Sequence, residues 1–440
     1  MSLRGAGRSN PLPTGAVSVG VGLLVGGLAQ YGFLSVVTHA LGATRAAPLA
    51  TFWALLFIAG PGFFLPLEQE VSRALAARRA QGLGGRPVVL RAGVAGLAVA
   101  GCLMLAAALA SGPIDSRLFK GDTWLGWALV AGLAAYYFEH LSRGTLAGNG
   151  RFSRYGVLLS SEGILRVVLC AGLAILGAKT AGPFGAALVV GSFAAVGIAL
   201  AGQRGLLEPG PHAAWREISS AIGFLLVASV MTQFLLSVGT VAVQLLASPA
   251  QQGAASRFLS SRIVAYVPLF LFQAVQATLL PKLAAFAGAG NFADYRRTMR
   301  QILLLVAAID VVSVVGITAL GPWGTRLLFG RGFELSSFDF LLLSTSSAVF
   351  VAAQALSQAL ISLRGYAQIA AAWLSGAIVF VVVTALGSQL FRRVETGLLA
   401  ASVVCVGMMV ALIVPLLRRR MLAPRADPAP VAISQALPEV

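Results

Sequence analysis

Charged side chains inside apolar stretches of this chain could carry chemistry. Glu162 and Arg166 lie four positions apart in such a stretch, so on a helix they share one face, with the acid before the base as an ion pair prefers. One interpretation is a pair that neutralises itself between helices. The other assigns ion coupling to Glu162 and lets Arg166 attract an anionic ligand into a cleft.

Arg257 and Arg262 begin a second stretch, followed by Gln273 and Gln276 on roughly one face. At about 1.5 Å per residue Arg262 lies deeper than Arg257, whose head group can reach the membrane surface. The two glutamines could line a polar path, although bonding between helices is their commoner role. With Arg166, these four residues are the candidate ligand-binding set.

Asp310 is the deepest carboxylate, near the middle of its apolar stretch. A buried acid can take up and release a proton, so Asp310 is the main candidate for ion coupling. The alternative is a neutral acid that bonds to a neighbouring helix. Four groups near the ends of their stretches are interpreted as interfacial: Glu68, Glu70, Glu139 and His140.

The elements that must position these residues are long uncharged runs. Hydrophobic residues make up 58% of the 440-residue chain, charged residues 11%, and the mean hydropathy is +0.86. Because a membrane-spanning helix needs roughly 20 mostly apolar residues, the runs predict an all-α polytopic membrane protein with about 12 transmembrane helices. They lie at about 16–38, 47–70, 88–111, 123–146, 156–178, 183–202, 219–246, 254–281, 301–321, 338–361, 367–390 and 396–417.

A polar break in the middle divides the helices into two lobes of six, as in a duplicated transporter, which would enclose a central cleft. The predicted organisation is an N-terminal segment, an N-lobe, a linker, a C-lobe and a disordered tail, at 1–15, 16–202, 203–217, 218–417 and 418–440. With both termini in the cytoplasm, about twice as many Lys and Arg residues fall inside as outside, which the positive-inside rule favours.

Several function classes are excluded by composition or spacing. The net charge of +17 could suit nucleic acid, but the basic residues flank the membrane and do not alternate with aromatics, so no nucleic-acid partner is expected. No phosphate-binding loop or hydrolase signature is present, so we expect neither an ATPase nor another enzyme. Cys102, Cys170 and Cys405 are isolated and are interpreted as small core residues, so we expect no disulfide, metal site or cofactor.

The layout also resembles a known family. The local signatures are Leu41-Gly42, then Glu68 and Arg73, Arg143-Gly144, Gly150-Arg151-Phe152-Ser153-Arg154-Tyr155, Pro281-Lys282-Leu283-Ala284 and Phe329-Gly330. Together they look like a polysaccharide flippase of the Wzx type, from the superfamily that also contains the multidrug and toxic compound exporters (MATE). The resemblance extends over nearly the whole chain.

The resemblance implies a MATE-like fold in a bacterial inner membrane. It also implies that a lipid-linked oligosaccharide on an undecaprenyl-diphosphate carrier is moved from the inner to the outer leaflet by alternating access. Arg166 would then attract the diphosphate. The implied partners are membrane lipids, a polysaccharide polymerase and glycosyltransferases. An ion-coupled multidrug or small-molecule antiporter is the alternative, and a non-transporting membrane scaffold or an enzyme is the third hypothesis.

Overall fold

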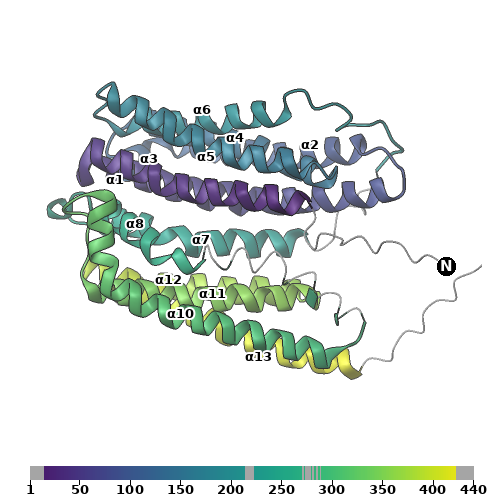
Figure 1. The fold of residues 1–440 in the computed structure, drawn as a ribbon. Helices are drawn as coiled ribbons and strands as arrows, with labels where there is room; N and C mark the ends of the chain where they lie inside the picture. The colour runs from purple at the N-terminus through teal and green to yellow at the C-terminus, as the bar shows by residue number, and fades with distance from the viewer. Residues whose placement is uncertain are drawn as a thin grey trace, which may run out of the picture.

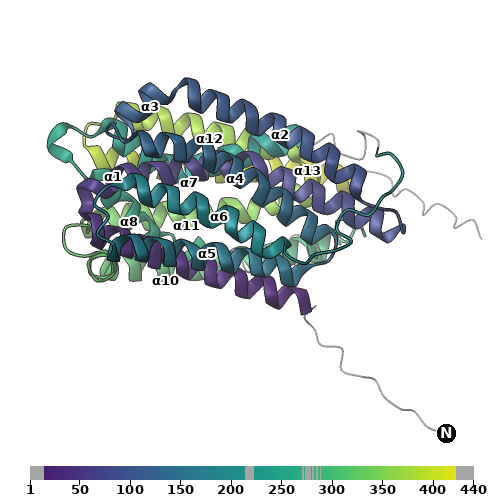
Figure 2. The same cartoon turned by 90° about the horizontal axis from the view of Figure 1, so that it is seen from above.

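The structure, a computed structural model, describes residues 14–213, 222–269 and 289–422, with a few single positions between the last two ranges. The described helices run roughly parallel in two layers (Figures 1 and 2). Helix α1 begins and helix α13 ends at the same end of the bundle, called here the terminal end. The other end is called the opposite end.

The first layer, the N-lobe, contains helices α1 to α6. They are α1 (Thr14–Ala80), α2 (Arg86–Leu109), α3 (Ser111–Arg117), α4 (Thr123–Gly148), α5 (Phe152–Ile175) and α6 (Ala181–Leu200). Helix α1 carries the first two predicted spans, and Gly42 bends it between them with a φ of 70° and a ψ of 171°. That combination is essentially restricted to glycine, so this residue makes the turn possible.

The second layer, the C-lobe, contains the remaining helices. They are α7 (Ile222–Leu246), the short η2 (Pro249–Gln251), α8 (Ala254–Ala265), α10 (Phe292–Phe329), α11 (Ser337–Ser362), α12 (Tyr366–Leu386) and α13 (Leu390–Leu422). The predicted span 254–281 begins where α8 begins. Its later part, with Gln273 and Gln276, lies outside the described residues.

Nine helices in the described ranges are long and apolar enough to cross a membrane, and α1 is one of them. Helix α4 has the length but carries Glu139, His140 and Arg143, and it is not among the nine. The chain is therefore an all-helical, multi-pass membrane protein. The described part contains no strand.

Each lobe has its own hydrophobic core. One cluster of buried side chains is built mainly from α1, α2, α4 and α6, and the other mainly from α7, α8 and α10 to α13. Leu259, Ile263, Phe329 and Phe333 belong by sequence to the C-lobe but pack in the N-lobe cluster. The lobes are therefore in contact through α8, the end of α10 and the residues just after it, and α1 also packs against α7.

The cysteines differ in part from the expectation. Cys170 and Cys405 are buried, as core residues should be, whereas Cys102 is exposed on α2. Apart from its inner face, α2 is covered with exposed apolar side chains such as Leu97 and Leu105, so Cys102 faces the same surroundings as they do.

Candidate functional site

The N-lobe contains a cluster of buried charges between α4 and α5. Arg143 of α4 makes ion pairs with Glu139 of its own helix and with Glu162 of α5, the latter at 3.3 Å between Nη2 and Oε2. Glu162 also pairs with Arg166, one turn further along α5. Glu139 is 0% exposed and Arg166 only 8%. The two arginines and two glutamates therefore neutralise one another inside the lobe.

Helix α1 contributes a third carboxylate beside this cluster. Glu68 accepts a hydrogen bond from the Tyr155 hydroxyl at 2.7 Å and lies 2.7 Å from Nδ1 of His140. The His140 ring stacks on that of Tyr136, with centroids 5.9 Å apart. Residues on α1, α4 and α5 thus form one polar network, called here the N-lobe network: Glu68, Glu139, His140, Arg143, Tyr155, Glu162 and Arg166.

The interfacial interpretation of these four groups was wrong, because Glu68, Glu70, Glu139 and His140 are all buried. Each residue lies near the end of its predicted span, which suggested contact with lipid head groups. The signal that could have revealed the network was the one-turn spacing of Glu139 and Arg143, the same spacing that marked Glu162 and Arg166.

Close packing of small residues brings α1 and α5 together. A Cβ added to Gly156 would lie 2.3 Å from the carbonyl oxygen of Ser18, and one added to Gly163 would lie 2.9 Å from the Ala29 Cβ. Larger side chains would therefore separate the helices, as is usual for small residues in membrane helix contacts. The glycines of α5 hold its charged face against the rest of the lobe.

Arg166 lies inside the N-lobe. Its guanidinium lies over the Trp53 ring, 4.6 Å from the centroid, and it lines a cavity of about 10 Å³ with Gly132, Leu188 and Ser192. These neighbours come from α1, α4 and α6, all of the same lobe. The geometry favours the self-neutralising pair with Glu162, and a role for Arg166 in binding an anion stays a prediction.

Arg262, in the last turn of α8, differs from the N-lobe arginines. It is 7% exposed, and its Nε and Nη1 atoms have no hydrogen-bond partner among the residues that the structure describes. Its guanidinium lies over the Tyr266 ring at 5.3 Å. The next residue, Ile263, packs in the N-lobe core and accepts a hydrogen bond from the Tyr31 hydroxyl at 3.3 Å. Arg262 is therefore a buried cation with no acid partner in the described ranges, on a helix that contacts both lobes.

The remaining arginine candidate on this stretch has different neighbours from Arg262. Arg257 is half-buried and lies over the Phe391 ring of α13, 5.8 Å from its centroid, so it contacts the C-lobe. Arg257 and Arg262 thus share helix α8 but not a common site. Arg166 belongs to the N-lobe network. The ligand-binding role of these residues stays a prediction.

Asp310 lies in the interior of α10. It is 7% exposed, its Oδ1 atom has no hydrogen-bond partner in the described ranges, and it lines a cavity of about 20 Å³. The other described residues around that cavity are apolar: Pro268, Phe272, Leu305, Val306, Ile309 and Val351. None of these residues has a side chain that could form a hydrogen bond with the acid from a neighbouring helix. The role of Asp310 in ion coupling stays a prediction.

One buried acid was not predicted at all. Glu395 of α13 is 0% exposed, and Arg392 and Asp339 are the charged groups that act on it. Because it follows Arg392 and Arg393 in sequence, the local pattern predicts a polar loop. Only the packing of α13 against α11 shows that it is buried.

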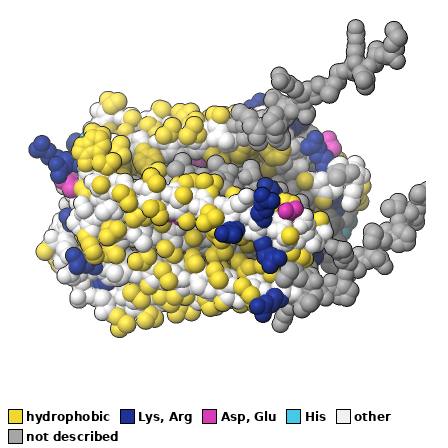
Figure 3. Space-filling model, turned by 60° about the horizontal axis from the view of Figure 1, so that its bottom comes forward, with side chains coloured by type: hydrophobic (Ala, Val, Ile, Leu, Met, Phe, Trp, Pro, Cys, Tyr) yellow, Lys and Arg dark blue, Asp and Glu magenta, His cyan; other side chains and the backbone are white. Residues whose placement is uncertain are grey.

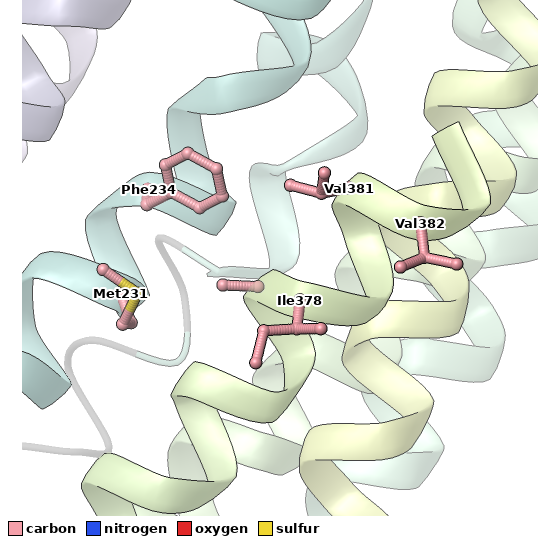
Figure 4. A pocket seen from close by; sticks show the side chains of 6 residues that line it. Met231, Phe234, Ile378, Val381 and Val382 are labelled. Carbon is pink, nitrogen blue, oxygen red and sulfur yellow. The ribbon is translucent and has the colours of Figure 1, made fainter. Parts of the chain in front are cut away.

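A wide groove between α7 and α12 contains no charged group. It is lined by Met231, Phe234, Ala377, Ile378, Val381 and Val382, and Figure 4 shows these side chains from the two helices turned toward one another. Such a surface suits hydrocarbon and offers nothing to orient a polar ligand.

Sequence comparison finds relatives of comparable length. A protein of Mycobacterium tuberculosis that is described only as uncharacterised is 28% identical over 375 residues, covering 82% of this chain and 81% of its own. A second such protein of the same species is 27% identical over 430 residues, covering 91% and 93%. No family model matches the chain.

Structure comparison finds MATE transporters. A multidrug resistance MATE family transporter of the MOP superfamily, in its outward-facing conformation, has a TM-score of 0.67 at 13% identity over 92% of this chain and 95% of its own. A Vibrio cholerae MATE transporter has a TM-score of 0.66 at 16% identity over 92% and 97%. At such low identity the likeness shows the fold alone, and this chain has the MATE fold.

Proposed function

We propose that this chain of MATE fold is a membrane transporter that moves a lipid-linked oligosaccharide with a diphosphate carrier from the inner to the outer leaflet by alternating access. The fold supports transport, because the solved structures that share it are transporters. Both termini are proposed to lie in the cytoplasm of a bacterium, on the basis of the charge bias of the loops. The proposed partners are membrane lipids, a polysaccharide polymerase and glycosyltransferases.

The choice of an anionic substrate depends on Arg262. A buried guanidinium without an acceptor is costly, and a diphosphate would supply the acceptors that the described residues do not. Because α8 also carries contacts to the N-lobe, a ligand on Arg262 would touch the element that links the two lobes. That position suits a substrate whose binding must change the relation between them.

The alternative is an ion-coupled multidrug antiporter. The observation that favours it is the set of buried carboxylates in the N-lobe, Glu68, Glu139 and Glu162, since acids suit a cationic drug or a coupling ion. These acids are all engaged by arginine, histidine or tyrosine. Each of these acids thus has a partner of opposite charge or a hydrogen-bond donor inside the lobe, whereas Arg262 has no acid partner among the described residues, which makes Arg262 the stronger indicator.

The test is a reconstituted assay of leaflet exchange. Proteoliposomes would contain a fluorescent undecaprenyl-diphosphate oligosaccharide, and its accessibility on the opposite leaflet would be measured. We expect Arg262→Ala to lower the rate roughly tenfold or more, because hydrogen bonds to a charged group are worth about 1.5–3 kcal/mol each. Arg262→Lys should retain more activity, because it keeps the charge.

Arg117→Ala is the matched control, because Arg117 is an exposed arginine at the end of α3 and should not affect the rate. Equal rates for Arg262→Ala and the unaltered protein would refute the role of Arg262. Export of a cationic dye, without movement of the oligosaccharide, would transfer the assignment to the antiporter.

Ion coupling is proposed for Asp310, with Glu162 as second candidate. We expect Asp310→Asn to make the transport rate independent of an imposed pH gradient, because the described residues around it offer no other titratable group. Transport would be measured with and without the gradient. Asp294→Asn, at the exposed start of the same helix, is the control. A gradient response that survives Asp310→Asn would refute this assignment.

A further inference from the structure

A second wide groove lies on the C-lobe between α10, α11 and α13. Its volume is about 400 Å³, within the roughly 300–1,000 Å³ typical of ligand pockets. Its floor is apolar and includes Met299, Leu303, Val410 and Val414. Val410 is 48% exposed and Val414 46%, so the groove opens on the outer surface of the lobe rather than toward its core.

Two arginines form the rim of this groove. Arg296 and Arg300 lie one helical turn apart on α10, and both side chains line it. Both are exposed, and neither has an ion pair or hydrogen bond with any residue that the structure describes. Tyr295, beside them, is turned inward and donates to the Ala359 carbonyl oxygen at 3.0 Å. The arginine head groups are thus available to a ligand.

The depth of these arginines matches the edge of the hydrocarbon. From Gln301 to Pro322, helix α10 rises by roughly 33 Å, close to the thickness of about 30 Å of the bilayer core. Trp323, 63% exposed, stands at the far edge of that segment, where aromatic side chains favour the interface. Arg300 therefore stands at the head-group level of the leaflet at the terminal end.

We propose that this groove binds one anionic phospholipid of the leaflet at the terminal end, with its phosphate on Arg296 and Arg300 and an acyl chain against α10, α11 and α13. Figure 3 shows hydrophobic side chains over the middle of the surface and basic side chains toward both ends, with several of them toward the right of the view. The charge complementarity favours an anionic over a zwitterionic head group. The site does not depend on which molecule the protein transports.

The groove between α7 and α12 gives an internal comparison. It is also wide and has apolar walls, but none of the six residues that line it is charged (Figure 4). Hydrocarbon contact alone would make the two grooves equivalent. The arginine pair of α10 is what distinguishes the site and allows its ligand to be defined by charge.

The test is a lipid titration of the purified full-length protein in detergent, followed by native mass spectrometry. Phosphatidylglycerol and phosphatidylcholine of the same acyl chains are the probes. We expect one phosphatidylglycerol molecule to bind more tightly than any phosphatidylcholine. The double variant Arg296→Gln/Arg300→Gln should weaken that binding roughly tenfold or more, since each basic residue near an anionic surface contributes about 1 kcal/mol.

Arg297→Gln is the matched control, because Arg297 is an exposed arginine between the two and does not line the groove. It should retain the tight lipid. Val414→Trp, which fills the groove without removing charge, should also lose it. Equal binding of the two lipids, or unaltered binding of phosphatidylglycerol by the double variant or by Val414→Trp, would overturn the proposal. A melting curve of each variant without added lipid checks that it is folded.

Discussion

At the level of single residues, buried charges in this protein fall into two groups. Those of the N-lobe network touch partners of opposite charge, as Arg143 does with Glu139 and Glu162. Arg262, Asp310 and Glu395 have no such partner in the described ranges. An unpaired buried charge reduces stability unless an anion neutralises the arginine or a proton neutralises the acid, so the second group contains the candidate sites for ligand and proton exchange.

The first group should be structural. We expect Glu162→Gln to lower the free energy of unfolding by about 3–5 kcal/mol, because it removes the ion-pair partner of the buried Arg166 and one of the two ion-pair partners of Arg143. The double variant Glu162→Gln/Arg166→Met should recover part of this loss. Unfolding in detergent at rising temperature would measure both.

Glu334→Gln is the control for an exposed pair. Glu334 pairs with Arg326 at 3.2 Å, and Arg326 is 57% exposed, so the loss should be below about 1 kcal/mol. An equal loss of unfolding free energy in Glu162→Gln and Glu334→Gln would contradict the stabilising role of the N-lobe ion pairs.

The sequence predicted these residues unevenly. One-turn spacing was enough to pair Glu162 with Arg166, because both lie in one helix. It could not pair Glu68 with His140, which are 72 positions apart and meet only when α1 packs on α4. Glu395 was missed for the same reason, since its burial depends on a helix remote in sequence.

At the level of helices, Gly42 has a backbone conformation that is essentially restricted to glycine. Its dihedral angles interrupt α1 between the first two predicted spans, and no atom lies within 4 Å of a Cβ built there. A substitution would therefore be opposed by the backbone conformation and not by crowding. The bend, not a loop of several residues, returns the chain across the membrane.

We expect Gly42→Ala to destabilise the protein by about 1–3 kcal/mol, the usual cost of holding a non-glycine residue in a disfavoured backbone region. Thermal unfolding would measure the change. Gly101→Ala is the matched control, because Gly101 also has open space around it but is helical in α2, where alanine should be neutral or slightly stabilising. A melting temperature unaffected by Gly42→Ala would contradict the expected backbone strain at this position.

Hydropathy predicted the long apolar helices but not where they begin. The ninth span was expected at 301–321, whereas α10 begins at Phe292, after Asn291 accepts a hydrogen bond from the Asp294 backbone N–H. Those first turns are polar, so an apolar window does not include them, although they carry the arginines of the proposed lipid site. In the same way α13 begins at Leu390 instead of 396.

At the level of the whole molecule, the lobes touch near the opposite end. The Ser35 hydroxyl of α1 donates to the Leu328 carbonyl oxygen of α10 at 2.6 Å, and Gly253 lies against the Ala43 backbone. Contacts between α1 and α7 join the lobes further along, where Pro61 accepts from Ser229 at 3.4 Å. Alternating access requires the contacts near the opposite end to separate.

We expect a covalent link between the lobes at this end to stop transport. Cysteines would replace Ser35 and Leu328 in a Cys102→Ser background, because Cys102 is the exposed cysteine of the described chain. A short bifunctional thiol reagent should cross-link the pair and abolish leaflet exchange. The same pair without reagent is the control, and full transport by cross-linked protein would rule out an opening at this end.

The N-lobe network also has an electrical consequence. Its acids, Glu68, Glu139 and Glu162, face two guanidiniums, so the sum is one negative charge, or none when His140 is protonated. Because all partners belong to one lobe, they would be displaced together if that lobe rocked. A single charge that crosses the whole field exchanges about 2.3 kcal/mol with a membrane potential of 100 mV. The voltage dependence contributed by this network would therefore be shallow, at most that of one elementary charge.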